Sequence, residues 1–344
     1  MIESNVICPS CKKNSMEVRY QTYWMCIGCG EKYPCVDGIP KLYIENSLGR
    51  ADKAHRDKVY KYMAWFYNFW NPFTMFPAMP FKIAFKYWIV YFILVLSAIF
   101  LIYNLIDWIA LRGIDQTTVY DILLFIVLII FIYFLAKQPR YFFLLLTALP
   151  VKFINSFRKF VPKKTHSAIH DEFFKEYLES NKKIKVLDIA SGTGKALFKH
   201  GYMDLNADYT AVDLAEGMIV QGRDLMGKLK APADFIIADA TDLPFQSNTF
   251  DISINYGAVN HFSDPESALR EMSRVTKKGG KILFKDEQEY KSSTWIEHIY
   301  FKYAFAYHNT IVGCPVHLLP SELEDVQVHQ VYRYAYICTA RKKK

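Results

Sequence analysis

The chain has 344 residues and a net charge of +8, and its composition is 52% hydrophobic, 16% aromatic and 22% charged. This composition excludes a disordered, collagen-like or coiled-coil protein, and the length allows about two domains. Residues 1–164 hold 20 Lys and Arg against 10 Asp and Glu, whereas residues 165–344 hold 22 against 24. The positive charge therefore belongs to the first half, where it raises the possibility of nucleic acid or an anionic membrane as a partner.

Four of the seven cysteines lie near the start of the chain. They form two pairs with the spacing C-x-x-C, Cys8 with Cys11 and Cys26 with Cys29. Two such pairs are typical of a structural zinc site, in which four thiolates close a tetrahedron around one ion. Chance pairs or disulfides are the alternative, but nothing at the start of the chain resembles a secretory signal. The sequence therefore predicts that these four cysteines bind a structural Zn²⁺.

The stretch behind the second pair carries a further pattern. From Cys29 to Tyr43 it reads C-G-E-K-Y-P-C-V-D-G-I-P-K-L-Y. It resembles the end of a small zinc-ribbon family, in which Y-P-x-x-D-G-I-P-x-L closes the fold. Members of that family bind and activate methyltransferases or precede methyltransferase domains in one chain, and one fused type methylates guanine in ribosomal RNA. The resemblance implies a zinc ribbon over residues 1–45 with a methyltransferase as its neighbour.

A strongly apolar region follows the predicted ribbon. Residues 46–82 are expected to form a linker and an interfacial aromatic segment, and residues 83–150 a transmembrane hairpin. The first apolar run, Tyr87–Ile106, has 20 residues without a charge, which as a helix span about 30 Å, the thickness of a bilayer core. The second run, Ile122–Ala136, has 15 residues and is short for a crossing, so a full span and a re-entrant segment both stay open. A buried pair of helices in a water-soluble domain is the alternative.

The charges around these runs predict an orientation. The connection at residues 107–121 is acidic, whereas the juxtamembrane segment 151–164 is basic and interleaved with phenylalanines. Because Lys and Arg stay on the cytoplasmic side, the pattern predicts an integral membrane protein with both soluble parts facing the cytoplasm. The basic segment suits anionic lipid head groups of the bilayer. RNA is the alternative partner for the same composition.

Residues 165–344 alternate helix and strand patterns, which predicts an α/β fold with a Rossmann-like, doubly wound parallel sheet. A short apolar strand at Ile184–Ile189 leads directly into the glycine-rich turn Ala190–Lys195. A strand, a glycine-rich turn and a helix form the nucleotide-binding arrangement of such folds. Further strands are expected at Tyr209–Val212, Phe235–Ala238, Phe250–Ile254 and Lys281–Lys285.

An ordered set of motifs accompanies these strands. They read V-L-D-I-A-S-G-T-G from Val186, A-D-A-T-D-L-P-F from Ala238 and R-E-M-S-R-V from Arg270. Together they resemble the class I S-adenosylmethionine-dependent methyltransferases, and above all the subgroup that acts in ubiquinone and menaquinone biosynthesis. The resemblance covers about residues 165–344. It departs from the usual pattern at Ala190, which stands in place of the first glycine of the loop, as is common in this subgroup.

The resemblance also implies which residues bind S-adenosylmethionine. The methionine and ribose end of the cofactor is assigned to Asp188, Ala190, Gly192 and Gly194. The ribose hydroxyls are assigned to Asp213, and the adenine ring to Leu214, Asp239 and Ala240. The segment that closes over the methionine moiety is expected to be Asn255 with Tyr256.

Two residues are candidates for the methyl-transfer step itself. Tyr256 follows the fourth strand, where its ring can contact the sulfonium or shape the opening for the methyl group. His261 lies just beyond, and its near-neutral pKa would allow it to remove a proton from the acceptor. Packing is the alternative role for Tyr256, and related sequences often carry a histidine near His261 that is not the base.

The combined expectation is a membrane-anchored S-adenosylmethionine-dependent methyltransferase that acts on a membrane-resident lipid, a quinone precursor or an isoprenoid. A methyltransferase for rRNA or tRNA bases tethered to the membrane is one alternative, and a non-catalytic docking protein that uses the zinc ribbon is another. Nucleic acid is the less favoured partner, because residues 165–344 carry no net positive charge. The sequence leaves the oligomeric state open.

Overall fold

The computed structural model describes residues 5–19, 22–49, 52–53, 56–57, 162–180, 182–194, 205–228, 233–290, 293–305, 313–332 and 334–344. The chain divides into two compact units. The first consists of Met1–Tyr67, Phe160–Tyr290 and Tyr307–Lys344, and the second of Asn68–Lys159 and Lys291–Ala306. In the second unit the described helix is α10, Trp295–Phe305. It begins with a capping box, because Thr294 donates to Glu297 while the Glu297 backbone N–H donates back to the Thr294 hydroxyl.

The predicted transmembrane hairpin at residues 83–150 lies outside the described residues. Among the residues that are described, no helix combines the length and the apolar character needed to cross a membrane. The longest described helix, α6 at His166–Ser180, has 15 residues, or about 22 Å against a bilayer core of about 30 Å. This finding contradicts the predicted integral-membrane localisation and the orientation derived from it.

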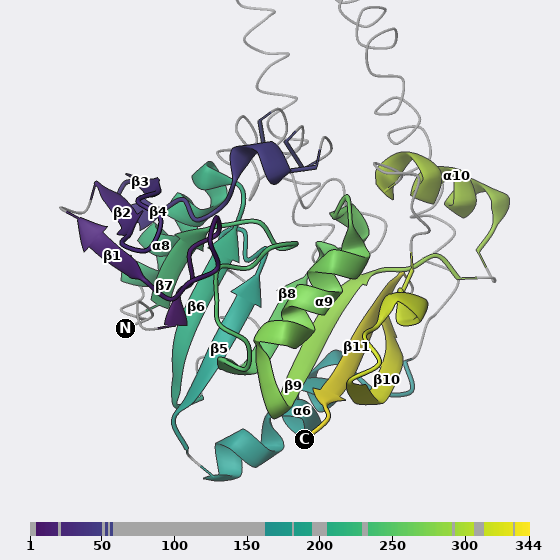
Figure 1. Cartoon of the computed structure of the whole chain (residues 1–344). Coiled ribbons are helices and arrows are strands. Elements are labelled where there is room, and N and C mark those ends of the chain that lie inside the picture. Colours follow the sequence, from purple (N-terminus) through teal and green to yellow (C-terminus); the bar gives the residue numbers. More distant parts are fainter. Residues whose placement is uncertain are drawn as a thin grey trace, which may run out of the picture. The chain divides into compact units, whose positions relative to one another are not determined.

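The N-terminal residues form a small antiparallel sheet in the order β1-β2-β3-β4, shown in purple in Figure 1. Its strands are β1 (Met16–Arg19), β2 (Tyr23–Cys26), β3 (Lys32–Val36) and β4 (Ile39–Pro40). Strands β3 and β4 are joined by Asp37 and Gly38, which both adopt a positive φ. Such a two-residue turn matches the twist of a hairpin and favours Asp-Gly. We call residues 5–43 the N-terminal module.

The large sheet has seven strands in the order β10-β11-β9-β8-β5-β6-β7. In chain order they are β5 (Ile184–Ile189), β6 (Ala207–Asp213), β7 (Ala233–Ile237), β8 (Phe250–Tyr256), β9 (Thr276–Glu287), β10 (Leu323–Tyr332) and β11 (Ala335–Lys342). Strands β5 to β9 pair in parallel, whereas β11 pairs antiparallel with both β9 and β10. The chain winds outward from β5 in both directions, so the Rossmann-like doubly wound sheet is confirmed, and its switch point lies between β5 and β8.

Two described helices connect strands of the large sheet, α8 (Glu216–Lys228) between β6 and β7 and α9 (Pro265–Val275) between β8 and β9, while α6 precedes β5. Helix α9 begins sharply, because the Asp264 carboxylate accepts a hydrogen bond from Ser267 N–H at 2.9 Å and Pro265 occupies the first turn. The last two strands, β10 and β11, were not predicted as a pair, since their pattern resembles no family signature.

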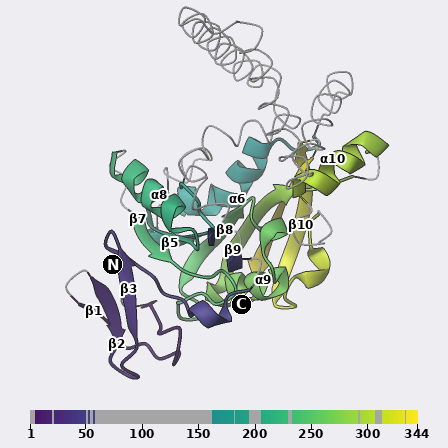
Figure 2. The same cartoon turned by 90° about the horizontal axis from the view of Figure 1, so that it is seen from above.

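The N-terminal module packs against the β7 edge of the large sheet (Figures 1 and 2). Beyond β4, Leu42 N–H donates to the Ile237 carbonyl at 2.8 Å, which adds a short parallel bridge to β7. Val6 forms an antiparallel bridge with Phe245, and both side chains are fully buried in one hydrophobic cluster with Leu42. The N-terminal module and the large sheet therefore share a core.

Candidate active site

A pocket opens at the carboxyl ends of the central parallel strands, at the switch point. The loops after β5, β6, β7 and β8 supply most of its lining. Ligands of doubly wound folds bind at this place, because the strand order reverses there and leaves a crevice. The residues predicted from sequence that line it are Ala190, Gly192, Asp213, Leu214, Asp239, Ala240, Tyr256 and His261.

The glycine-rich loop after β5 contains three residues in the left-handed backbone conformation. Ala190, Gly192 and Gly194 have φ angles of +52°, +56° and +70°. A Cβ on Gly192 would come within 3.3 Å of the Met218 side chain, so the loop lies tightly against α8. Ala190 adopts the same conformation with a side chain, which is an unfavourable geometry for a non-glycine residue.

Asp213 joins the glycine-rich loop to the end of β6. Its two carboxylate oxygens accept hydrogen bonds from Gly192 N–H at 2.7 Å and from Ala215 N–H at 2.8 Å. Burial raises the pKa of Asp213 to about 6, although the backbone donors work in the opposite direction. Each oxygen keeps a second lone pair for a ligand hydroxyl. Asp213 therefore shapes the loop as well as facing the pocket.

Asp188 and two other predicted cofactor residues are not among the residues that line the pocket. Asp188 is 1% exposed within β5, and neither carboxylate oxygen has a hydrogen-bond partner among the described residues. Burial, reinforced by the charge of Asp213, raises the pKa of Asp188 well above its usual range. Gly194 is buried in the loop. Asn255 donates to the Ile189 carbonyl at 2.8 Å, so it holds β8 against β5. Asp188, Gly194 and Asn255 therefore support the elements that line the pocket without being part of the lining.

The loop after β7 carries the other carboxylate of the pocket, Asp239. It is 5% exposed, and its Oδ1 accepts a hydrogen bond from Thr241 N–H at 2.9 Å. Burial raises the pKa of Asp239. Together with Asp52 and Asp213 it places three carboxyl groups in the pocket lining. A negatively lined pocket fits a cationic cofactor such as S-adenosylmethionine, whose sulfonium and amino groups are positive.

Tyr256 and His261 lie on the far side of the pocket from the β7 loop. The Tyr256 hydroxyl is 2.9 Å from Nε2 of His170, and the two rings stack with centroids 6.0 Å apart. His170 lies on α6 and is 3% exposed. Sequence reasoning missed it, and the only signal was a second histidine four residues after His166 on an amphipathic helix.

His261 lies beside two carboxylates at the end of β9, Asp286 and Glu287. One ring nitrogen of His261 and one carboxylate oxygen from each of the two acids lie within 4.8 Å of one another. Asp286 accepts hydrogen bonds from Asn260 N–H at 2.8 Å and from Glu287 N–H at 2.9 Å. Burial and the neighbouring Asp286 charge raise the pKa of Glu287 well above its usual range. The two acids were not predicted, since they follow the strand that carried no motif.

Two further lining residues come from a segment that the sequence assigned to the linker. They are Asp52 and Arg56. The Asp52 carboxylate accepts hydrogen bonds from the backbone N–H of Ser263, at 3.2 Å, and from the Ser263 hydroxyl. Nothing in the local sequence marked these residues, because a polar stretch after a small domain resembles any exposed connection.

The structure brings the four N-terminal cysteines together. Their sulfur atoms lie within 4.8 Å of one another, with Cys8 and Cys29 3.7 Å apart and Cys11 and Cys26 3.5 Å apart. All four are free thiols. Burial opposes ionisation of Cys26, but hydrogen bonds led by the Ser15 hydroxyl lower its pKa to about 6. Four convergent sulfurs are the donor set of a structural zinc site. The identity of the ion stays a prediction.

Comparison with known proteins agrees with this geometry. Residues 187–284 match the family model described as a methyltransferase domain. This part of the chain is similar to methyltransferase domains. It contains the glycine-rich loop, Asp213, Asp239 and the Tyr256–His261 segment, which are the residues around the pocket.

Curated relatives match over the same region. A demethylmenaquinone methyltransferase of Renibacterium salmoninarum is 42% identical over 100 residues, which are 29% of this chain and 39% of the relative. A ubiquinone/menaquinone biosynthesis C-methyltransferase of Idiomarina loihiensis is 35% identical over 130 residues, 36% of this chain and 49% of the relative. The chain thus spans less than half the length of these relatives.

Solved structures show only distant similarity. The phosphoethanolamine N-methyltransferase 2 of Haemonchus contortus, in complex with S-adenosyl-L-methionine, is 14% identical, with a TM-score of 0.43. The match covers 51% of this chain and 52% of that one.

Proposed function

We propose that the chain transfers the methyl group of S-adenosylmethionine to a ring carbon of a quinone precursor. The observation that carries this proposal is the pocket at the switch point, where the loop ends of the methyltransferase motifs meet in one place. The acceptor class is supported by the relatives, whose names refer to demethylmenaquinone and to ubiquinone/menaquinone biosynthesis.

The described residues provide one group for each part of the cofactor. Asp213 is placed to accept hydrogen bonds from the ribose hydroxyls, and Leu214 to pack on adenine. Asp239 and the backbone of Ala240 are placed to meet the polar edge of the adenine ring. The buried oxygens of Asp188, which have no partner among the described residues, leave hydrogen-bonding capacity that we assign to the amino end of the cofactor. When bound, S-adenosylmethionine supplies a methyl group already activated on a positively charged sulfonium.

His261 is our candidate for the proton acceptor in the transfer. A ring carbon gains the methyl group, the carbon–sulfur bond breaks, and the electron pair stays on sulfur to give neutral S-adenosylhomocysteine. The ring must lose one proton, and His261 can take it from a ring hydroxyl or from the methylated carbon. Asp286 and Glu287 lie within reach of its ring and can stabilise the imidazolium that forms. Tyr256, held by His170, forms the wall beside the reacting methyl group.

The test is methyl transfer by the purified full chain. S-adenosylmethionine with an isotopic methyl label is incubated with demethylmenaquinone, with a total lipid extract and with total RNA, and each product is read by mass. We expect label in the demethylmenaquinone and in the quinone fraction of the extract, and loss of transfer in Asp213→Ala. Asp171→Asn, an exposed carboxylate on α6, is the control and should retain activity. Label found only in RNA or in protein would overturn the quinone assignment.

A further inference from the structure

The segment that ends the N-terminal module and continues beyond it contributes to the cofactor pocket. We call the described residues of this segment, 41–49, 52–53 and 56–57, the strap. It begins at the β7 edge, where Leu42 N–H bonds to the Ile237 carbonyl, and it supplies Asp52 and Arg56 to the pocket lining. The strap is therefore part of the pocket as well as a connection along the chain.

The start of the strap is anchored along β7 and α8. The Lys41 ammonium lies 2.5 Å from the Glu216 carboxylate at the first turn of α8. Tyr43 and Leu48 are 9% and 5% exposed, and they pack in one cluster with Ile237. Helix α8 follows directly on Asp213 and Leu214, so the strap is held by the elements that carry the cofactor residues.

The end of the strap is locked by Arg56. Its guanidinium donates to both carboxylate oxygens of Glu45 at 2.8 Å and to the Tyr43 hydroxyl at 3.0 Å. Two parallel bonds to one carboxylate fix the orientation of the guanidinium plane. The Arg56 side chain is only 12% exposed. The strap therefore folds back on itself, and Arg56 is already neutralised, which makes it a positioning residue.

Asp52 is the strap residue with a charge available to a ligand. It is bonded to Ser263, and a Cβ on the nearby Gly49 would collide with the Ser263 hydroxyl, so strap and loop are in close contact. Its charge acts on Asp239, whose pKa is raised first by burial and also by the Asp52 carboxylate. Asp52 thus connects the turn after His261 with the lining of the pocket.

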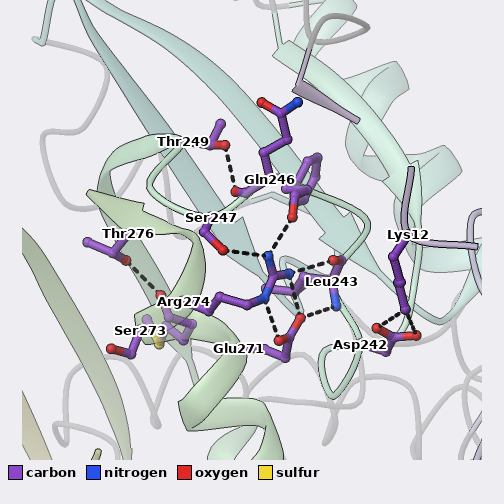
Figure 3. Close-up of polar contacts among 12 residues, drawn as sticks. Lys12, Asp242, Leu243, Gln246, Ser247, Thr249, Glu271, Ser273, Arg274 and Thr276 are labelled. Carbon is purple, nitrogen blue, oxygen red and sulfur yellow. Dashed lines mark hydrogen bonds and ion pairs between the residues drawn. The ribbon is translucent and has the colours of Figure 1, made fainter. Parts of the chain in front are cut away.

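The N-terminal module also holds the loop that carries Asp239. Ile7 N–H donates to the Pro244 carbonyl at 3.0 Å, and Lys12 lies 2.5 Å from the Asp242 carboxylate. Lys12 follows Cys11 and bonds through its N–H to the Cys8 carbonyl at 2.8 Å, so it belongs to the first cysteine turn. Figure 3 shows Lys12 on Asp242 at one end of this loop.

From the other side the same loop is held by helix α9. The Arg274 guanidinium donates to the carbonyls of Leu243, at 2.9 Å, and Phe245, at 2.6 Å, and it is paired with Glu271 (Figure 3). The loop is therefore clamped between Arg274 of α9 and Lys12 of the first cysteine turn. A movement of that turn would be transmitted to Asp239.

We propose that the strap forms a wall of the cofactor pocket, with Asp52 as a cofactor-binding residue, and that the metal-loaded cysteine turns hold this wall in place. The inference rests on the proposed function, since it concerns the same cofactor. The four-cysteine donor set fits a tetrahedral ion. Removing that ion loosens Lys12 and the strap, so it weakens cofactor binding without altering any residue of the glycine-rich loop.

The first experiment measures cofactor affinity of the full chain by calorimetry. S-adenosylmethionine is a net cation, whereas its product S-adenosylhomocysteine is neutral, so loss of a carboxylate affects the two ligands differently. We expect Asp52→Asn to weaken S-adenosylmethionine about tenfold and S-adenosylhomocysteine less. Asp171→Asn, the exposed control, should bind both ligands like the unaltered chain.

The second experiment removes the ion. Zinc released by a chelator is counted with a colorimetric indicator, and the affinity for S-adenosylmethionine is measured before removal, after removal and after zinc is restored. We expect weaker binding in the stripped protein and recovery on reloading. Lys12→Ala keeps all four cysteines and removes only the contact to Asp242, so it should weaken binding by about threefold with zinc still bound.

The outcomes separate the two proposals. If Asp52→Asn and the stripped protein both bind like the unaltered chain, the inference about the strap is wrong while the proposed function stands. If the unaltered, zinc-loaded chain does not bind S-adenosylmethionine, the proposed function fails and the inference fails with it.

Discussion

The cysteine cluster and the cofactor pocket are both made from turns that follow short strands, but their functional groups are supported differently. The four sulfurs face mainly one another, so the arrangement depends on an ion at their centre. The carboxylates of the pocket are held by backbone N–H groups, as Asp213 is by Gly192 and Ala215. The comparison indicates that the large sheet holds the Asp213 side of the pocket by itself. The N-terminal module, and the pocket wall that it supports, are expected to require the predicted metal.

Metal removal should give the largest effect and tests this difference directly. Structural zinc contributes on the order of 10 kcal/mol to folding of small domains. We expect a chelator to increase hydrogen exchange strongly in residues 5–43, while β5 and β8 stay protected by their own parallel pairing. Exchange measured by mass spectrometry, with the reloaded protein as control, checks this. An equal loss of protection in both sheets would show that the large sheet also depends on the metal, which would contradict this comparison.

Asp213→Ala should give the next largest effect, this time in the pocket. It removes the acceptor for two loop N–H groups as well as the group assigned to the ribose. Hydrogen bonds to charged groups contribute about 1.5–3 kcal/mol each, so the affinity for S-adenosylmethionine should fall at least about 100-fold. Calorimetry measures it. The cysteine cluster should still bind one equivalent of zinc, and a loss of zinc in this variant would show that the substitution disturbs more than the pocket.

The pH dependence of cofactor binding should be a smaller effect. The pKa of Asp213 is raised to about 6, so the carboxyl is mainly protonated at pH 5 and ionised at pH 7. Only the ionised form accepts hydrogen bonds through both oxygens. Affinity should therefore rise about tenfold from pH 5 to pH 7, with a midpoint near 6.

Other groups in the pocket titrate as well, so a matched variant is needed. Burial also raises the pKa of Asp188 and Asp239. In Asp213→Asn the step near pH 6 should disappear, whereas any dependence that comes from the other two carboxyls should persist. An unchanged profile in Asp213→Asn would assign the titration to a different group.

The smallest predicted effect concerns Ala190. Its φ of +52° is a conformation that glycine adopts without penalty. Ala190→Gly relieves this strain in the folded chain, but it also gives the unfolded chain more conformational freedom. Because the first effect is larger, the free energy of unfolding should rise by about 0.5–1 kcal/mol. Chemical denaturation measures it, with Ala233→Gly in β7 as a control that should destabilise. Destabilisation by Ala190→Gly would show that the Ala190 methyl group contributes to packing.

The large sheet and the centre of the pocket were predictable because their signals are local. Short apolar strands lead into loops with a fixed motif spacing, and Ala190, Asp213 and Asp239 do line the pocket, although their cofactor roles stay predictions. Asp188, assigned to the same cofactor by the resemblance, is buried in β5 and does not line the pocket. The four cysteines were also found from spacing alone, and their sulfurs do converge.

What could not be predicted depends on contacts between distant segments. Asp52 and Arg56 look like any polar linker until β7 and Ser263 are in place. Asp286 and Glu287 gain a role only from the turn that carries His261. The predicted integral-membrane localisation was wrong by the same comparison, because none of the described helices has the length and the apolar character to cross a membrane. The uncharged runs on which that prediction depended lie outside the described residues.

The short bridge between Lys41 and Ile237 has one more consequence. Strand β7 ends the large sheet on that side, and an open edge strand is a template for pairing with other chains. The N-terminal module covers part of that edge and buries Phe245 beside it. Expressed without residues 1–57, the methyltransferase domain would expose both, so we expect it to aggregate rather than remain a monomer.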